Sequence, residues 1–456
     1  MVAHTIGQTE LSATEIFRAH GLTPFRGVLS PDCFGRIRPD SPTPKTVLVA
    51  EVVFWLMATV ALGDGAMAGG VLSFWAPLRA ILPQLPIAPV TEEAFCLARK
   101  ALPLRFFLLL FADLANRFEH RFDAAFRWQG RRLLGIDGMD CDLPRHPHLR
   151  RLFRPAGNHR GPVGCPQARL VGLVGLNDGV CHAFRWTSLA VSEQTSARRL
   201  LGHLRPGDLL LADRNFPDLE TFAGVLDRSA DFLIHLPSTR FLQRARIATG
   251  STRSDEWYID LPLPERLRQR YPKLGPLLRL RILQYQRPGF RTSWLITSLL
   301  DTGQFPYEEL VPLYHRRWNQ ETLHREWKYT LQVSNLRSQT AAGLLKEILV
   351  QLTLNNAIRW IMAEAAGPPA CPVQLKFLES KRLILAHLPV MLAAPACLLP
   401  ELYRQMLQAM ARERIVVRPG RSYPRRWDTH ARPKGHGKTA APARLPSTQE
   451  KSNAPI

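Results

Sequence analysis

The sequence predicts an α/β protein in which a mixed β-sheet with helices packed on it is preceded and followed by helical segments. Two patterns predict this class. From about Trp128, short apolar runs bounded by polar turns alternate with helical segments, which is typical of strands and helices that share one sheet. Before residue 126 and after residue 305, the apolar residues recur in longer, helical runs. A chain of 456 residues with 46% hydrophobic side chains can form two or three structural units.

Residues 1–125 are predicted to form a helical N-terminal domain. Helices are expected over Thr46–Leu62, after Thr91 and over Leu104–Phe118. Thr91 is followed by two acids, which is the pattern of a helix N-cap with negative charge in the first turn. The first run contains Glu51 and is shorter than the ~20 residues that span a bilayer. We therefore expect a buried core helix there.

Residues 126–365 are predicted to form the domain with the mixed sheet. A helix over residues 192–204 is expected to begin at Ser192 as its N-cap, with Glu193 in the first turn. The order of strands and helices favours a mixed sheet with helices on it. The strand candidates are residues 132–137, 168–176, 180–186, 208–213 and 231–237.

A β-rich insertion is predicted at about residues 238–300, with strand-like segments and no clear helix. One long helix is expected from about Pro306 to Lys328, and another from Ala341 to Ala365. Further helices are predicted over 366–416. Residues 417–456 are basic, rich in Pro and Gly and almost without aliphatic side chains, so a disordered tail is expected.

The charge balance indicates a polyanionic partner. Lys and Arg number 60 against 38 acids, a formal net charge of +22, which favours nucleic acid first and an anionic membrane surface second. The helical N-terminal domain is then either a DNA-binding unit or structural support. Seven scattered cysteines and the absence of a signal-peptide pattern indicate reduced thiols in a cytosolic protein.

Four polar residues recur at helical spacing in the segment 313–328. On a helix that advances about 100° per residue, Tyr314, Arg317, Glu321 and Lys328 share a stripe of about 60°. One acid among phosphate-binding groups suits a metal ion and a DNA backbone that meet on one helix face. A solvated charged face is the alternative. Glu326 lies on another side of this helix and is predicted to be a surface acid.

Two further acids are expected at the rim of the sheet. Asp137 and Asp213 each end an apolar run, where a carboxylate is rigidly held yet close to substrate. Either one alone is more often a turn residue or a helix cap. Together with Glu321 they provide the oxygen ligands that Mg²⁺ or Mn²⁺ prefers. Asp140 and Asp142 compete with Asp137 for this role, and Asp137 is preferred because it closes the apolar run.

These motifs resemble a known family. The spacing Tyr314-x2-Arg317-x3-Glu321-x6-Lys328 is similar to the signature of bacterial insertion-sequence DDE transposases of the insertion element 4 type. The segments IDG at 136–138, ADRNF at 212–216 and TSLLD at 297–301 resemble further motifs of that family. One departure is Asn215, where the family usually has Gly. The resemblance covers nearly the whole chain.

The resemblance implies an RNase H-like catalytic domain that carries Asp137 and Asp213 on its sheet and Glu321 on a helix. It implies Mg²⁺ or Mn²⁺ as cofactor and double-stranded DNA with terminal inverted repeats, together with target DNA, as substrates. A homodimer would move the element by cut-and-paste transposition. A stand-alone nuclease and a catalytically silent DNA-binding derivative are the alternatives. The residues expected to contact DNA are Tyr314, Arg317, Lys328 and, beside Asp213, Arg214.

Several other residues have competing interpretations. A cluster of His and Cys between Cys141 and Cys165 fits no standard zinc spacing, and the arginines between them favour a DNA-facing loop. Trp318 is expected in the core under the sheet. Trp257 and Trp294 are interpreted as core residues of the insertion, with stacking on an extruded base as the alternative.

Overall fold

The structure is a computed structural model. It describes residues 25, 28, 29, 34, 50–63, 91–122, 124–153, 155–158, 161–237, 246–248, 253–287 and 290–416. The predicted tail at 417–456, and Cys33, Arg154, His159 and Arg160, lie outside these residues.

The three helices predicted in the N-terminal segment are confirmed within the described residues. They are α3 (Ala50–Leu62), α5 (Glu92–Ala101) and α6 (Leu104–Phe122). The Thr91 hydroxyl accepts a hydrogen bond from the Ala94 amide at 3.2 Å, as its N-cap role requires. No helix in the described part of the chain is long and apolar enough to cross a membrane.

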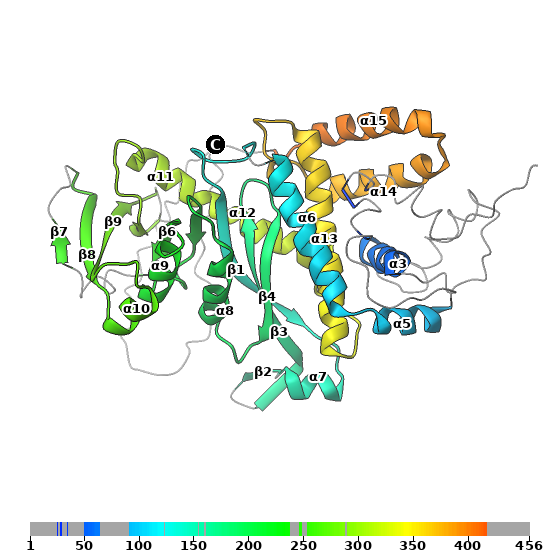
Figure 1. The fold of residues 1–456 in the computed structure, drawn as a ribbon, viewed down its shortest axis with the longest axis horizontal. Coiled ribbons are helices and arrows are strands. Elements are labelled where there is room, and N and C mark those ends of the chain that lie inside the picture. The colour runs from blue at the N-terminus through cyan, green and yellow to red at the C-terminus, as the bar shows by residue number, and fades with distance from the viewer. Residues whose placement is uncertain are drawn as a thin grey trace, which may run out of the picture.

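Ten strands of the described chain form one sheet. Their order is β2-β3-β1-β5-β6-β10-β9-β8-β7, with β4 paired to β3 (Figure 1). The strands are β1 (Leu133–Asp142), β2 (Pro155–Asn158), β3 (Gly161–Gly175), β4 (Cys181–Ser188), β5 (Leu209–Ala212), β6 (Asp231–Leu236), β7 (Arg246–Ala248), β8 (Glu256–Pro262), β9 (Leu277–Tyr285) and β10 (Ser293–Thr297).

The strands β4, β3, β1, β5 and β6 form the centre of the RNase H-like arrangement. β3 is antiparallel to both β1 and β4, whereas β1, β5 and β6 are parallel neighbours. The helices α8 (Glu193–Leu200) and α9 (Leu219–Leu226) connect these strands. Parallel strands need such crossovers because their starts lie at the same edge of the sheet. All five strands predicted from apolar runs in this region are confirmed.

The predicted insertion extends this sheet. Strand β10 is antiparallel to β6, and β9, β8 and β7 follow outward from it. The expectation of no helix here was wrong, because α10 (Glu265–Arg270) lies between β8 and β9. The short sequence ERLRQR has too few apolar positions to show a helical period.

The single long helix predicted from Pro306 to Lys328 was also wrong. The segment consists of α11 (Tyr307–Tyr314), a 3₁₀ turn at His315–Arg317, α12 (Trp318–Arg325) and a π turn at Glu326–Thr330. Pro312 inside α11 cannot donate a helix hydrogen bond. A 3₁₀ turn advances about 120° per residue, so residues on either side of it change phase relative to a straight α-helix.

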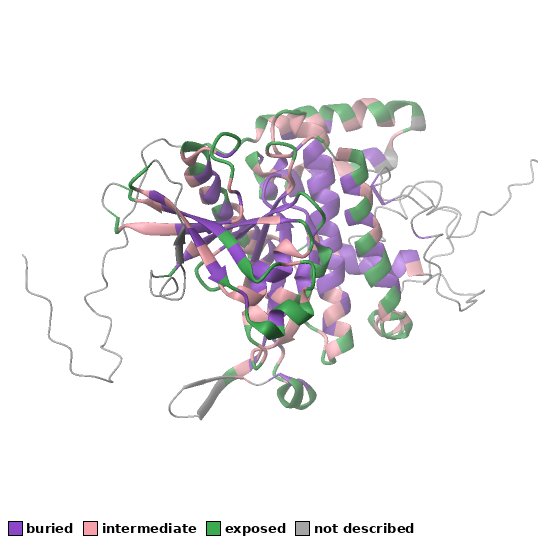
Figure 2. Cartoon of the chain, turned by 60° about the vertical axis from the view of Figure 1, so that its left-hand side comes forward, coloured by how far each residue is buried: buried purple, intermediate pink, exposed green. Residues whose placement is uncertain are grey.

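Long C-terminal helices follow, of which the first packs against β4 and the other two pack on the first. These are α13 (Ala341–Ala366), α14 (Phe377–Ala393) and α15 (Leu399–Arg412). α6 lies alongside α13, so helices from the two ends of the chain share one core with the sheet. A second core lies under α8 and α9 on the opposite face. Figure 2 shows α13 and the central strands as the most buried elements.

A buried ion-pair network ties α6 to the start of the sheet. Glu119 of α6 pairs with Arg132, Arg205 and His182, and Arg132 also donates to Asp208 at 2.7 Å just before β5. Burial alone would raise the pKa of Glu119, but His182 and the two arginines lower it to about 2. Glu119 therefore stabilises the fold above its ordinary pKa of 4.5, and this contribution is lost as the pH falls through about 2.

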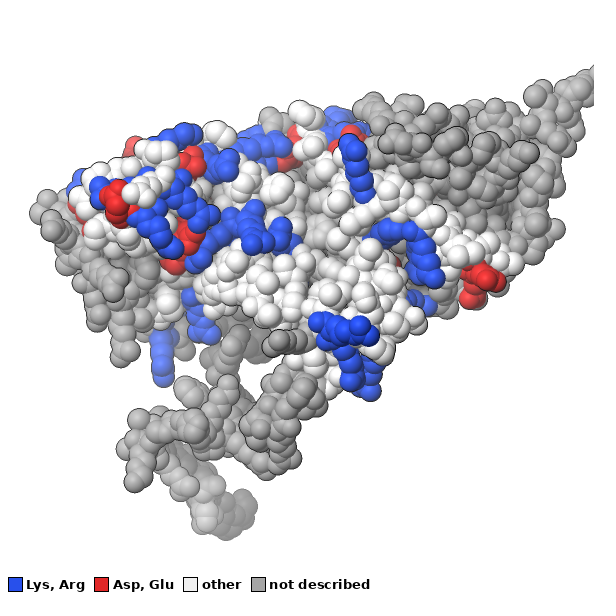
Figure 3. Space-filling view, turned by 60° about the horizontal axis from the view of Figure 1, so that its bottom comes forward, with Lys and Arg blue, Asp and Glu red and all other residues white. Residues whose placement is uncertain are grey.

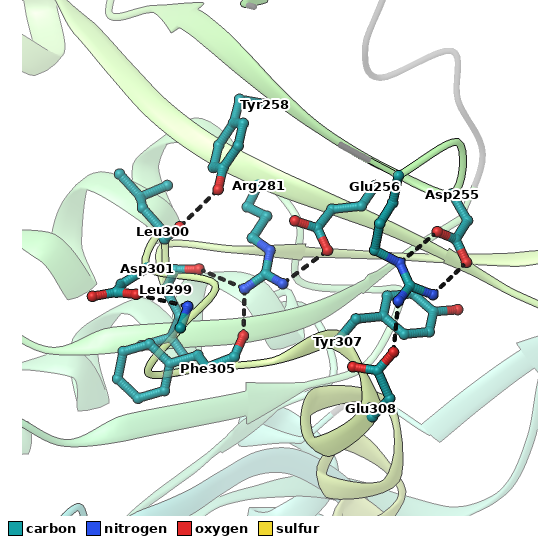
Figure 4. A network of polar contacts seen from close by, with 12 residues as sticks. Asp255, Glu256, Tyr258, Arg281, Leu299, Leu300, Asp301, Phe305, Tyr307 and Glu308 are labelled. Carbon is teal, nitrogen blue, oxygen red and sulfur yellow. Dashed lines mark hydrogen bonds and ion pairs between the residues drawn. The ribbon is translucent and has the colours of Figure 1, made fainter. Parts of the chain in front are cut away.

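A second network joins the outer strands to the loop before α11 (Figure 4). Arg281 of β9 has no solvent exposure and pairs with Glu256 of β8 at 2.9 Å. Its other terminal nitrogen donates to the Phe305 carbonyl at 2.6 Å. On the adjacent surface, Arg253 pairs with Glu308 and lies over the Tyr307 ring. The insertion thus fixes the point at which α11 begins.

We expect Arg281→Met to destabilise the protein by about 3–5 kcal/mol, because it leaves the Glu256 carboxylate buried without a partner. Arg279→Met on the same strand is the matched control. Arg279 pairs with Asp260 at the surface, so its loss should cost less than about 1 kcal/mol. Denaturant unfolding of both variants measures the difference, and equal losses would contradict the structural role of Arg281.

Candidate active site

Asp137 and Asp213 lie side by side on adjacent strands. Ile136 of β1 is paired with Ala212 of β5 in parallel register, so the next residue on each strand is one of the two acids. Leu133 and Leu211, an even number of residues before the acids, pack into the core on the α13 face. Because side chains alternate along a strand, Asp137 and Asp213 belong to that same face.

The prediction that Asp137 ends its strand was wrong. β1 continues to Asp142, paired with β3 over its whole length. β5 ends at Ala212, so beyond Ile136 the β1 edge has no parallel partner. Asp137 therefore lies within β1 and not in a turn, and its side chain is 17% exposed.

The turn after β5 is closed by the Asp213 side chain. The Asn215 amide donates to Asp213 Oδ1 at 2.8 Å, and the Phe216 amide donates to the Asp213 carbonyl at 3.2 Å. Phe216 is buried and anchors the turn. Among the described non-glycine residues, only Gln129, Ser229 and Gln332 have a positive φ. Asn215 therefore needs no left-handed backbone, and the departure from Gly leaves the turn intact.

Glycines in the sheet let α12 approach closely. A Cβ on Gly135 would lie 2.4 Å from Gln320 Oε1, and one on Gly172 would lie 3.0 Å from the Trp327 ring. Trp327 is fully buried and donates to Asn355 of α13 at 3.0 Å. These contacts hold α12 and the π turn after it against β1 and β3.

Two of the predicted residues on this segment are in direct contact. Arg317 donates to Glu321 at 3.0 Å across one helical turn, and Arg317 is only 8% exposed. Its charge also acts on Asp137. Arg317 therefore lies between the helix acid and the strand acids.

Tyr314 is 5% exposed and its ring stacks on His235 of β6 with centroids 6.0 Å apart. Burial raises the pKa of the Tyr314 hydroxyl, whereas the charge of Arg317 and a hydrogen bond with it lower that pKa. In this structure, the buried Tyr314 hydroxyl is hydrogen-bonded to the Arg317 side chain. It is not at the surface that the predicted stripe assumed.

Two other predictions for this segment were wrong. Trp318, expected in the core, is 51% exposed and lies against Arg317, whose guanidinium carbon is 5.5 Å from the ring centroid. Glu326, expected at the surface, pairs with the buried Arg359 of α13. The 3₁₀ and π turns change the angular position of both side chains.

Lys328 lies in the π turn, half-buried, next to the 69% exposed Tyr329. Its ammonium nitrogen is 6.0 Å from the centroid of that ring. Arg214, directly after Asp213, is exposed. Arg214 thus has open access to solvent beside Asp213, whereas the charge of the half-buried Lys328 acts on Cys141 of β1.

His324 and Glu193 were missed as site residues. His324 Nδ1 is 3.9 Å from Asp137 Oδ2, and burial lowers the pKa of His324 to about 4, with the charge of Arg317 adding to the effect. Glu193 begins α8 after its Ser192 cap and acts on Asp137 from the other face of the sheet. The cap pattern located Glu193 on a helix, but its position over β1 depends on the tertiary fold.

The local charge pattern is that of a cation site. Burial and the neighbouring charge of Glu193 raise the pKa of Asp137 to about 7, and Asp213 adds to this effect. The Gly138 amide and Arg317 oppose it. No three His, Cys, Asp or Glu side chains in the described ranges are grouped so that they could hold a metal as they stand. Glu321 pairs with Arg317 in the structure.

The competing acids have other partners. Asp140 pairs with Arg169 of β3 at 2.8 Å, and Asp142 accepts from Gln167 at 2.7 Å. Both are exposed and brace the hairpin of β1 and β3. Their contacts are consistent with the preference for Asp137.

The arginine-rich segment after β1 was predicted to be a loop. It contains the helix α7 (Pro147–Leu152) and strand β2, which pairs with β3. Arg145, Arg150 and Arg151 are exposed there. Trp257 and Trp294 pack against the second core, as the core interpretation predicted.

Comparisons with known proteins show similarity to transposases. Residues 128–356 match the family model described as "Transposase DDE domain". The chain is 26% identical over 421 residues to the transposase InsG for insertion sequence element IS4 of Escherichia coli (strain K12), covering 89% of this chain and 91% of that protein. A solved structure of the piggyBac transposase synaptic complex with hairpin DNA is 11% identical, with a TM-score of 0.42, covering 90% of this chain and 88% of that chain.

Proposed function

Because the chain belongs to the DDE-domain transposase family and is a DNA transposase, we propose that Asp137, Asp213 and Glu321 are its three catalytic carboxylates. The parallel register that puts Asp137 beside Asp213 carries this proposal. Glu321 reaches the same face of β1 through the close packing of α12. Family membership also settles the class of chemistry, since these enzymes cut and join DNA strands.

Enzymes of this family use divalent metal ions, and the residues at this site fit such ions. The three carboxylates provide hard oxygen ligands, and the mutual repulsion of Asp137, Asp213 and Glu193 is what a bound cation relieves. We propose Mg²⁺ or Mn²⁺. When bound, these ions activate a water molecule or a 3′-hydroxyl and stabilise the leaving oxygen during in-line attack on phosphorus.

Arg317 links DNA binding to the position of Glu321, because the same guanidinium can bind either Glu321 or a DNA phosphate. Its guanidinium pairs with Glu321 in the structure, and a phosphate is a strong competing partner for such a group. A DNA backbone that takes Arg317 releases Glu321 toward Asp137 and Asp213. The hydrogen bond with Tyr314 keeps the Arg317 guanidinium in place during this exchange.

Basic side chains around the acids provide the surface for DNA. Arg214 follows Asp213 and Lys328 follows Glu321 by seven residues, while Arg150 and Arg151 lie on α7 and Arg145 lies just before it. Figure 3 shows that Lys and Arg outnumber Asp and Glu on one face of the molecule. We propose that the substrates are the terminal inverted repeats of an element and a target DNA, that two copies of the chain hold two ends during cut-and-paste transfer, and that this occurs in the cytoplasm.

Replacing any of the three acids should abolish catalysis. We expect Asp137→Ala, Asp213→Ala and Glu321→Gln each to slow Mg²⁺-dependent cleavage of end DNA by at least about 1,000-fold, since each removes several kcal/mol of charge stabilisation. Binding to the same DNA should persist. Asp140→Asn, on the same strand, is the control and should cleave normally. Cleavage by any of the three variants would refute the site assignment.

Arg317 and Lys328 should contribute to phosphate binding. We expect Arg317→Ala and Lys328→Ala each to weaken end-DNA binding and to lower the slope of log affinity against log salt by about 1. Fluorescence anisotropy at several KCl concentrations measures both effects. Arg404→Ala on α15, where Arg404 pairs with Glu401, should leave the slope unchanged. An unchanged slope for Arg317 or Lys328 would reject its phosphate contact.

A further inference from the structure

Glu193 approaches the catalytic aspartates from the face of the sheet opposite Glu321. It is the first residue of α8, whose N-cap Ser192 accepts from the Thr195 amide at 3.1 Å. α8 packs on the second core, under Val171 and Leu210. α12 lies on the other face. Two helices therefore deliver one glutamate each to the same stretch of β1.

The seat for Glu193 exists because residue 138 is glycine. A Cβ at Gly138 would lie 2.6 Å from Glu193 Oε1, well inside the distance that real side chains tolerate. The Gly138 amide donates to Asp137 Oδ1 at 2.9 Å. The same backbone unit thus contacts the Asp137 carboxylate and leaves room for the Glu193 carboxylate.

The next residue of α8 is bonded to the turn that carries Asp213. Gln194 donates from Nε2 to the Asn215 carbonyl at 3.1 Å. The start of α8 is therefore held between Asp137 on β1 and the Asp213 turn after β5. This geometry places Glu193 beside Asp137 and within electrostatic reach of Asp213.

The electrostatics agree with this placement. Burial raises the pKa of Glu193, Arg169 lowers it, and the charge of Asp213 raises it again. Among the described residues, the cation whose charge acts on Glu193 is Arg169, and it already pairs with Asp140 at 2.8 Å. A structural ion pair therefore does not explain why an acid is placed here.

We propose that Glu193 is a fourth carboxylate of the catalytic centre, which binds a divalent metal ion together with Asp137. This inference rests on the proposed function of Asp137 and Asp213. The enzymes of this family use divalent metal ions. The close approach of Glu193 to Gly138, beside Asp137, makes Glu193 the candidate for an additional metal ligand. The proposal does not change the roles of Asp137, Asp213 and Glu321 in cutting and joining DNA strands.

The test is Mn²⁺ binding to the full chain in the absence of DNA, by calorimetry and by the rise in melting temperature that Mn²⁺ produces. We expect Glu193→Gln to weaken Mn²⁺ binding by about 10-fold to 100-fold and to reduce the melting shift. In EDTA this variant should melt no lower than the wild type, because one member of a repelling carboxylate set has been neutralised.

Gly138→Ala gives a second route to the same result, since its methyl group displaces the Glu193 carboxylate without changing any charge. Each variant has a matched control. Glu265→Gln changes the first residue of α10, another short helix, and Gly275→Ala adds a Cβ whose nearest neighbour is 4.0 Å away. Neither control should change Mn²⁺ binding.

Asp137→Asn separates the two proposals. If Mn²⁺ binds Glu193→Gln as tightly as the wild type while Asp137→Asn binds it weakly, Glu193 is not a ligand and the proposed function stands. If neither substitution changes Mn²⁺ binding, the three-acid site and the role of Glu193 are both wrong. Weakened binding in Glu193→Gln, Gly138→Ala and Asp137→Asn, with both controls normal, establishes the fourth carboxylate.

Discussion

The close approach of α12 to β1 and β3 is the constraint on which the active site depends. Gly135 and Gly172 leave the sheet surface without side chains, and Trp327 fills the space and bonds to α13. A helix held this near to a sheet cannot shift by a residue without a clash, because interiors are close-packed. The backbone of α12, which carries Glu321, consequently has one defined position on the sheet.

The register of the sheet fixes the positions of the two strand acids. Parallel pairing of β1 with β5 fixes Asp137 and Asp213 as neighbours, and a slip of one residue would turn both to the opposite face. The buried network at Glu119 holds the starts of β1 and β5, and the one at Arg281 holds the outer strands β8 and β9. Rigid elements of this kind support catalytic groups more accurately than loops do.

Much of this arrangement could be predicted from sequence, and the failures have physical causes. The position of Asp213 after an apolar run and the shared helix face of Arg317 and Glu321 followed from local patterns, whereas the direct contact between these two side chains was not predicted. Trp318 and Glu326 were misplaced because the 3₁₀ and π turns lie on either side of α12, and a constant rotation per residue cannot represent them. Glu193 and His324 approach Asp137 only through tertiary packing, for which sequence spacing holds no signal.

The Arg317–Glu321 pair gives the free protein a particular thermodynamic character. An acid engaged by an internal guanidinium is a poorer ligand for metal, and a guanidinium engaged by an acid is a poorer ligand for phosphate. Whatever binds one partner releases the other. On the proposed roles of Glu321 as a metal ligand and Arg317 as a phosphate ligand, DNA and metal would raise each other's affinity by the same factor. The free enzyme would then bind the metal more weakly than the enzyme on DNA.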